Sequence, residues 1–126
     1  MKLTLFPTLE EALELHRILI ERFGGEAGVR DLGLLQSALA RPQTGYYDTL
    51  WLQAAALLQS LGRSHPFIDG NKRVAFALTA VFLRMNRHRV VVRAADGESF
   101  LIERVIGAHA DLAEIAAWLE GCARPV

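Results

Sequence analysis

The sequence has one cysteine, Cys122, and no excess of charge of either sign. A lone thiol cannot form an intrachain disulfide or supply a cysteine-based metal site, so the chain fits a reducing, cytoplasmic compartment. Its 14 basic and 14 acidic residues cancel. This balance argues against a protein whose main role is to wrap nucleic acid, because such proteins carry a clear basic excess. Any strongly positive site must therefore be local.

Long hydrophobic runs are also missing. The longest run, at 74–83, is shorter than the roughly 20 residues that a membrane span needs. Near the N-terminus, Pro7 and the acidic pair Glu10 and Glu11 interrupt any apolar stretch, so we expect no secretory signal. A chain of 126 residues that is 52% hydrophobic and 22% charged has the size and composition of one globular domain. We expect a single soluble domain spanning 1–126, with no membrane association.

Apolar residues recur at helical spacing over most of the chain. Thr8 with Glu11, and Asp111 with Glu114, are spaced as capping boxes that begin a first and a last helix. Asn86 can end a helix in a left-handed conformation. The short stretch 89–93 can be extended, but it is too isolated to build a sheet. The expected helices cover about 9–23, 32–41, 49–61, 71–85, a stretch from about 96, and a stretch from about 112.

The helix at 71–85 is apolar almost all round, so we expect it to be the central, buried helix of the fold. It begins inside the motif His65-Pro-Phe-Ile-Asp-Gly-Asn-Lys-Arg73. The whole pattern predicts an all-α, compact bundle of about six helices.

The motif at 65–73 places two cations where a helix begins. The helix dipole makes this position positive already, so Lys72 and Arg73 should each cost about 0.3–1 kcal/mol there. A bound phosphate would reverse the sign of that cost, because the free N–H groups of a first turn bind anions. Gly70 lets a ligand approach the backbone closely. The motif therefore predicts a phosphate-binding cradle.

The remaining motif residues suit catalysis. His65 can act as a general base near neutral pH, and Pro66 biases its backbone towards an extended conformation. Phe67 can plug the loop into the core. Asp69 can be a ligand for Mg²⁺ or a plain cap for the following helix, and we favour the metal role. Asn71 can donate its amide to a phosphate oxygen.

The motif resembles the signature loop of the Fic/Doc superfamily, and most closely that of its Doc (death-on-curing) branch. The stretches 9–16, 28–35 and 37–42 also look like that branch, so the resemblance covers most of the chain. It implies an all-α toxin of a type II toxin–antitoxin system that uses ATP and Mg²⁺ to modify a hydroxyl of a protein, with elongation factor Tu as the family's best-known target. By motif position it implies a catalytic base at His65, a Mg²⁺ ligand at Asp69, and phosphate binding by Gly70, Asn71, Lys72 and Arg73.

Two departures from the wider Fic pattern bear on the reaction. Most Fic proteins have glycine where this chain has Lys72, and a second arginine where it has Phe76. The resemblance therefore implies the reversed nucleotide pose of Doc and transfer of the terminal phosphoryl group, with AMP transfer as the alternative. The stretch 116–121 lacks the hydroxyl residue of a Fic inhibitory helix, so inhibition by a separate antitoxin is implied. A non-catalytic partner-binding module and a DNA-binding domain are the other hypotheses.

Overall fold

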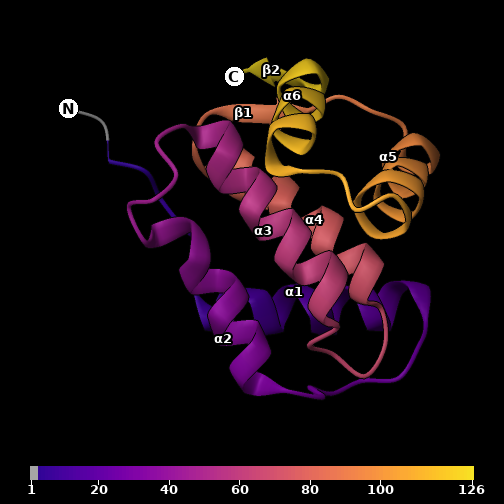
Figure 1. Cartoon of the computed structure of the whole chain (residues 1–126). Coiled ribbons are helices and arrows are strands. Elements are labelled where there is room, and N and C mark those ends of the chain that lie inside the picture. Colours follow the sequence, from indigo (N-terminus) through magenta and orange to yellow (C-terminus); the bar gives the residue numbers. More distant parts are fainter. Residues whose placement is uncertain (1–2) are drawn as a thin grey trace.

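The computed structural model describes residues 3–126, and most of these residues are helical (Figure 1). Within these residues the chain forms six α-helices, one 3₁₀ turn (η1), one π-helical segment (η2) and two short strands. The predicted all-α architecture of about six helices is confirmed. The elements are α1 Leu9–Phe23, α2 Leu32–Ala40, η1 Arg41–Gln43, α3 Leu50–Ser64, α4 Asn71–Met85, β1 His88–Val90, α5 Ala94–Phe100, η2 Leu101–Gly107, α6 Leu112–Cys122 and β2 Ala123–Pro125.

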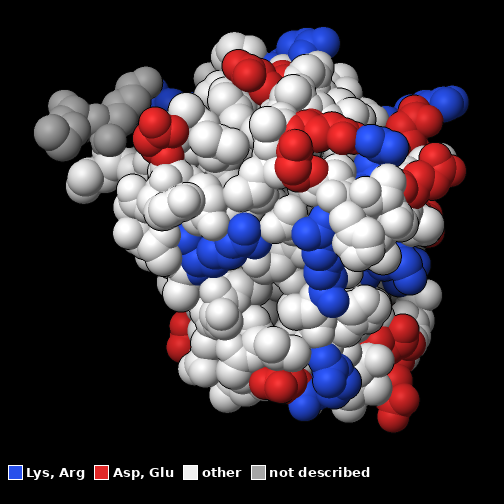
Figure 2. Space-filling model, viewed as in Figure 1, with Lys and Arg blue, Asp and Glu red and all other residues white. Residues whose placement is uncertain are grey.

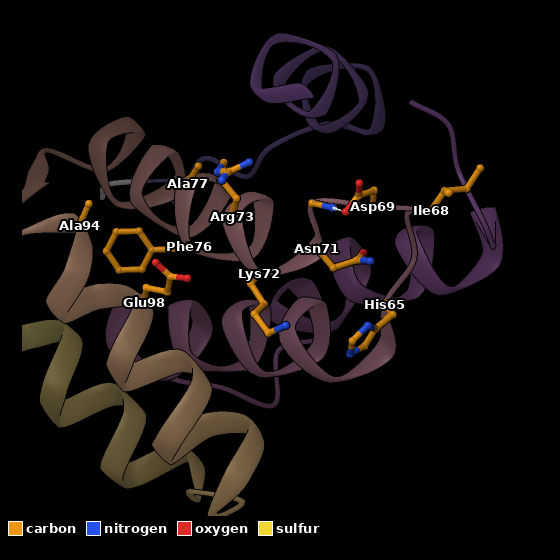
Figure 3. Close-up of a pocket in the computed structure, with 11 residues that line it drawn as sticks. His65, Ile68, Asp69, Asn71, Lys72, Arg73, Phe76, Ala77, Ala94 and Glu98 are labelled. Atoms are coloured by element: carbon orange, nitrogen blue, oxygen red, sulfur yellow. Dashed lines mark hydrogen bonds between the residues drawn. The ribbon is translucent and has the colours of Figure 1, made fainter. Parts of the chain in front are cut away.

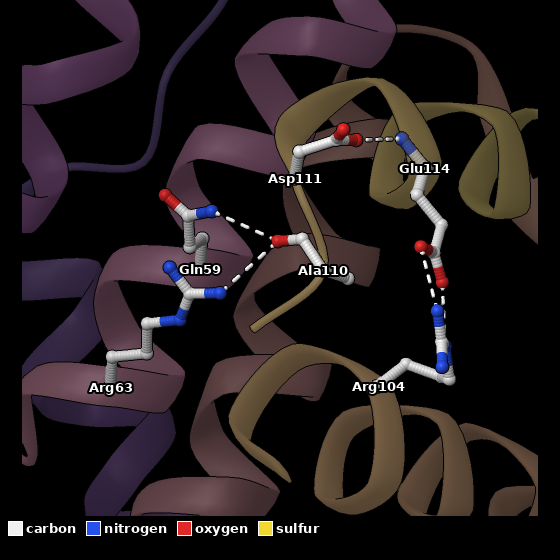
Figure 4. Close-up of polar contacts among 6 residues, drawn as sticks. All are labelled: Gln59, Arg63, Arg104, Ala110, Asp111 and Glu114. Carbon is white, nitrogen blue, oxygen red and sulfur yellow. Dashed lines mark hydrogen bonds and ion pairs between the residues drawn. The ribbon is translucent and has the colours of Figure 1, made fainter. Parts of the chain in front are cut away.

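The predicted capping box of α1 is present in full. The Glu11 N–H donates to the Thr8 hydroxyl at 3.1 Å, and the Thr8 N–H donates to the Glu11 carboxylate at 2.9 Å. At α6 only half of the predicted box forms. Asp111 accepts from the Glu114 N–H at 2.8 Å, but the Glu114 carboxylate pairs with Arg104 instead of returning to the helix start (Figure 4). The Glu114 carboxylate thus binds the Arg104 guanidinium in place of the Asp111 N–H.

Helices α3 and α4 share the centre of the molecule. Helix α4 packs along α3, and α6 covers another side of α3 (Figure 1). The stretch 54–58 of α3 is fully buried, and α4 buries the face that carries Val74, Leu78 and Phe82. The expectation of a buried helix after the motif therefore holds, but α3 is at least as central. Residues 65–70, which we call the site loop, join these two helices and are held between rigid supports.

Two local expectations around the end of α4 are wrong. Asn86 has φ −110° and is not left-handed; Arg87, with φ 70°, takes that role. The Asn86 side chain instead bonds the N–H and the carbonyl of Leu5, at 2.9 and 2.8 Å. The extended stretch is not isolated either, because β1 pairs antiparallel with β2, with Arg89 opposite Arg124. These partners lie far away in the sequence, so local pattern could not reveal them.

Helix α6 is an ordinary core helix, as its apolar pattern predicts. Ile115 and Leu119 are buried, and Trp118 stacks on Phe100 with ring centroids 4.0 Å apart. The approach to α6 is tied to α3, since the guanidinium of Arg63 donates to the Ala110 carbonyl at 3.1 Å (Figure 4). No helix within residues 3–126 combines the length and apolarity needed to cross a bilayer.

Candidate active site

A cleft of about 530 Å³ opens where the α3–α4 loop, the first two turns of α4 and helix α5 meet (Figure 3). All six residues predicted from the motif line this one cleft: His65, Asp69, Gly70, Asn71, Lys72 and Arg73. The rest of the lining comes from Ile68, Phe76, Ala77, Ala94 and Glu98. The structure thus brings the predicted residues together beside a space large enough for a small-molecule ligand.

The His65 backbone is left-handed, with φ 54° and ψ 60°, where it caps the C-terminus of α3. The expectation that Pro66 would hold it extended is wrong. A non-glycine residue in this conformation costs of order 1–2 kcal/mol, so surrounding contacts must hold it. Arg30 supplies them, because its Nε donates to the His65 carbonyl at 2.7 Å and its Nη2 donates to the Ser64 carbonyl at 2.8 Å. The imidazole is left exposed at the mouth of the cleft.

The α1–α2 connection, residues 24–31, runs beside the site loop, and we call it the bracing segment. It forms an antiparallel bridge between Val29 and Phe67, and the Ile68 N–H donates to the Gly28 carbonyl at 3.1 Å. Gly28 has φ 117°, and a Cβ atom there would lie 2.9 Å from Ile68 Cδ1. Glycine is favoured at this position because of its conformation, and any Cβ atom there would also displace the terminal methyl of the exposed Ile68 side chain.

Underneath the loop, Phe67 is 1% exposed and stacks on the buried ring of His16, with centroids 3.9 Å apart. The prediction that Phe67 plugs the loop into the core is confirmed. His16 Nε2 lies 2.9 Å from the Asp69 carbonyl. A carbonyl only accepts, so Nε2 carries the proton and donates. His16 therefore has a structural role.

The Asn71 amide closes the loop. Its Oδ1 accepts from the Phe67 N–H and its Nδ2 donates to the Phe67 carbonyl, both at 2.9 Å. The sequence analysis predicted that this amide donates a hydrogen bond to a phosphate oxygen. In the structure one of its two N–H groups is already bonded, and one remains for a ligand.

The Asp69 carboxylate joins the site loop to the bracing segment. It accepts from the Glu26 N–H at 3.0 Å and from the Gly70 N–H at 2.8 Å. These two bonds, in that order, lower the pKa of Asp69 from its ordinary value, and the nearby Arg73 adds to the effect. The alternative of a helix cap is wrong, since Gly70 is the N-cap of α4 and no side chain caps it. The carboxylate is thus held ionised at the edge of the cleft.

These features of Asp69 fit a magnesium ligand. Each carboxylate oxygen accepts one hydrogen bond and retains a second lone pair. Within residues 3–126, no three His, Cys, Asp or Glu side chains gather into a metal cage. Mg²⁺ does not need one, because it is commonly bound by one or two carboxylates together with substrate phosphates and water. Asp69 would therefore hold the ion only in combination with a nucleotide.

Lys72 and Arg73 leave the first turn of α4 on different sides. The Lys72 amine points toward His65, whereas the Arg73 guanidinium points away from it (Figure 3). Arg73 lies over the ring of Phe23, 4.7 Å from its centroid. The first turn of α4 contains no acidic residue. The positive charge that faces His65 therefore comes from Lys72 and the helix start.

Three residues important to this geometry were not singled out for it by sequence reasoning. Arg30 and His16 act through contacts with residues 35 and 53 positions away. Glu98 reaches the cleft from α5, a helix without a motif. Local spacing carries no signal for such contacts. The only pointer was that Arg30 and His16 fall in stretches that carry the family resemblance, at 28–35 and 9–16.

The surface gives little support to DNA binding. On the face drawn in Figure 2, basic and acidic side chains are interspersed, and the basic ones do not form a continuous band. Backbone recognition of DNA uses a clustered basic surface, because affinity comes from neutralised phosphates. This face of the described residues therefore offers no continuous basic surface for DNA.

With the site's geometry defined, the chain was compared with known proteins. The model of the Fic/DOC family matches residues 6–83, which include the site loop and most of α4. This chain belongs to the Fic/DOC family. It is 47% identical to a protein named Toxin Doc from Mycolicibacterium smegmatis over 111 residues, which are 80% of this chain and 82% of that protein. It is 36% identical to Protein kinase doc of Escherichia phage P1 over 81 residues, 61% of this chain and 64% of the phage protein.

This Fic/DOC membership confirms the resemblance drawn from the motif. The family match ends at residue 83, ahead of α5 and α6. Glu98 and Ala94, which line the far end of the cleft, therefore lie outside the matched region. The cleft residues at 65–77 lie within the family match, whereas Ala94 and Glu98 must be interpreted from this chain alone.

Proposed function

We propose that this protein is the toxin of a toxin–antitoxin pair and that it transfers the terminal phosphoryl group of ATP to a hydroxyl side chain of a protein. One observation carries the proposal: the exposed His65 imidazole, the Asp69 carboxylate and the Lys72 amine meet at the start of α4 in a single cleft. The names of the two relatives, a toxin and a protein kinase, support the same reaction.

In this reaction the acceptor oxygen forms a bond to the γ-phosphorus while the bond from that phosphorus to the β–γ bridging oxygen breaks. His65 takes the proton of the acceptor hydroxyl, and ADP leaves with the bridging oxygen. Lys72 and the N–H groups of the first turn of α4 stabilise the negative charge on the phosphoryl oxygens. Asp69 would hold Mg²⁺ together with the nucleotide, and the ion would supply positive charge to the phosphates.

Lys72 and Phe76 favour phosphoryl transfer over AMP transfer. Lys72 occupies the position where most Fic proteins have glycine, so a cationic side chain stands at the helix start. Phe76 replaces a second arginine, so the cleft lacks that cation one turn further along α4. Both changes favour a pose with the terminal phosphates at the helix start. AMP transfer to a protein hydroxyl is the alternative reaction.

The protein target and the antitoxin belong to the proposal as well. Elongation factor Tu is the first target to test, and its modification would inhibit translation. Helix α6 has Ala116 at the position of the inhibitory-helix hydroxyl residue and is packed into the core. Inhibition by a separate protein is therefore the simpler arrangement.

The proposal is tested with ATP labelled separately at the α- or γ-phosphate, in the presence of Mg²⁺ and purified elongation factor Tu or a bacterial lysate. His65→Asn is the informative variant, because asparagine tolerates the left-handed backbone at φ 54° and removes the base. His109→Asn is its matched control, since His109 is exposed and has φ 52°.

We expect label from the γ-phosphate on one protein, lost in His65→Asn and retained in His109→Asn. Label from the α-phosphate would instead identify an AMP transferase. If neither label is transferred and His65→Asn behaves as the parent, the non-catalytic binding module becomes the better hypothesis.

A further inference from the structure

The two ends of the cleft differ in chemistry. At one end lie the imidazole of His65, the carboxylate of Asp69 and the cationic start of α4. The other end is formed by Phe76, Ala77, Ala94 and Glu98, and Glu98 is its acidic group. Arg73, four residues before Ala77 on α4, also lines the cleft and points away from His65 (Figure 3). A ligand that fills the whole cleft would therefore place anionic groups beside His65 and Lys72, and hydrogen-bond donors beside Glu98.

Helix geometry sets the distance between the ends. Lys72 and Phe76 are four residues apart on α4, so they share a face and are separated by about 6 Å along the helix. Ala94 and Glu98 have the same spacing on α5 and likewise share a face. The two helices thus present these four side chains to one elongated cleft (Figure 3).

Gly97 brings α5 close enough for Glu98 to reach the cleft. The Phe76 ring lies against this glycine, so that a Cβ atom at position 97 would be 2.7 Å from Phe76 Cζ. A side chain at position 97 would force either the Phe76 ring or α5 to shift. Glu98 follows directly in the chain, and its carboxylate lies beside the Phe76 ring at the cleft (Figure 3).

The Glu98 side chain makes no hydrogen bond and no ion pair with any other residue in 3–126. A carboxylate only accepts hydrogen bonds, and its negative charge repels phosphate. The groups of a nucleotide that suit it are therefore the donors of the nucleoside, the ribose hydroxyls first, since the ribose follows directly on the phosphates. Carboxylates bind ribose hydroxyls in this way in other nucleotide-binding folds.

We propose that Glu98 binds the ribose of the nucleotide and thereby selects ribonucleotides, with Phe76 and Ala94 as the apolar surface beside it. This inference deepens the proposed function and depends on a nucleotide entering the cleft. A ribose bound by Glu98 at the far end directs the phosphates along α4 toward its first turn, with the terminal phosphoryl group nearest His65. Glu98 is thus a specificity-determining residue, and it takes no part in proton transfer.

The test compares ATP with 2′-deoxyATP, each with Mg²⁺, in the parent and in Glu98→Ala. Glu103→Ala is the matched control, because it removes the same charge from an exposed glutamate that does not line the cleft. Equilibrium binding by calorimetry is measured alongside transfer of γ-label, and the melting temperature of each variant verifies folding.

We expect the parent to bind ATP about tenfold more tightly than 2′-deoxyATP, the loss typical of a hydrogen bond to a charged group. In Glu98→Ala this ratio should fall to about one and KM for ATP should rise about tenfold, with kcat little changed. Glu103→Ala should keep the parent's ratio. Glu98→Gln, which retains an acceptor oxygen, should be intermediate.

An unchanged ratio in Glu98→Ala, with γ-label transfer intact, would overturn the role of Glu98 and leave the proposed function standing. Conversely, a ratio that depends on Glu98 without any γ-label transfer by the parent would support the binding role and refute the kinase. If the parent binds neither nucleotide, both inferences are wrong.

Discussion

Arg30 offers the sharpest test of how the fold positions the site. Its guanidinium donates to the His65 and Ser64 carbonyls at 2.7 and 2.8 Å, and so caps the C-terminus of α3. These bonds hold His65 at φ 54°. Arg30→Ala should therefore free the His65 backbone to leave the left-handed region, and the imidazole would move with it.

The magnitude follows from these two bonds. A hydrogen bond to a charged group contributes about 1.5–3 kcal/mol, but Arg30 is exposed, and solvent reduces the value. We expect Arg30→Ala to lower the free energy of unfolding by about 1–2 kcal/mol in total, equivalent to about 3–8 °C in melting temperature. The catalytic loss should be larger, because a displacement of about 1 Å in a reacting group can lower the rate about 100-fold.

The assay combines thermal unfolding with γ-label transfer at temperatures where every variant is folded. Arg30→Ala should lower kcat about 10- to 100-fold with little change in KM for ATP, because the nucleotide contacts are not touched. Arg30→Lys keeps the charge without the two-pronged geometry, and should restore only part of the rate. A purely stabilising role for Arg30 would leave kcat of the folded variant unchanged.

Arg17→Ala is the matched control. Arg17 is an exposed arginine of α1 that pairs with Glu14 and Glu21 on the surface. Its loss should cost under about 1 kcal/mol and leave transfer unchanged. If Arg30→Ala melts like the parent, or reduces kcat no more than Arg17→Ala does, the idea that Arg30 positions His65 is wrong.

Three further predictions concern the same loop. Hydrogen bonds from the backbone lower the pKa of Asp69, so its ionised carboxylate stabilises the fold at a pH above the ordinary pKa of 3.8, and this stability is lost as the pH falls through the pKa of the folded state. The melting temperature of Asp69→Asn should therefore lie below the parent's at pH 7 and approach it in acid. If the melting temperatures of the two proteins differ by the same amount at every pH, this prediction is wrong. Gly28→Ala should destabilise the protein in urea unfolding, because its Cβ would lie 2.9 Å from Ile68 at φ 117°, whereas Gly121→Ala, in α6 with nothing within 4 Å, should add about 0.5–1 kcal/mol. His16→Ala should cost about 1–3 kcal/mol in the same measurement, since it leaves the Asp69 carbonyl without its donor.

The features that sequence predicted correctly are those written in neighbouring residues. The cap of α1 depends on Thr8 and Glu11, three positions apart, and the helix after the motif depends on apolar spacing. The cleft residues at 65 and 69–73 were also found from one continuous motif, and the structure places all of them at one cleft. A local signal sufficed because one loop between two buried helices carries them.

What sequence missed depends on long-range partners. His65 is left-handed although Pro66 biases it towards an extended backbone, because Arg30 reaches across from the bracing segment. Strand β1 pairs with β2, which follows α6 at the C-terminal end of the chain. Glu98 reaches the cleft because Gly97 admits the Phe76 ring. In each case the deciding contact joins segments whose proximity is a result of the fold.

The site residues differ in how cleanly mutation can report their chemistry. Asn71 and Asp69 form hydrogen bonds that hold the loop, the first to Phe67 and the second to Glu26. Loss of activity in their variants would therefore mix ligand binding with loop distortion. The side chains of His65 and Lys72 form no hydrogen bond or ion pair with other residues in 3–126. Their replacement removes a reactive group and leaves the loop's own bonds intact, so the base and the phosphate-facing charge are best tested at these two positions.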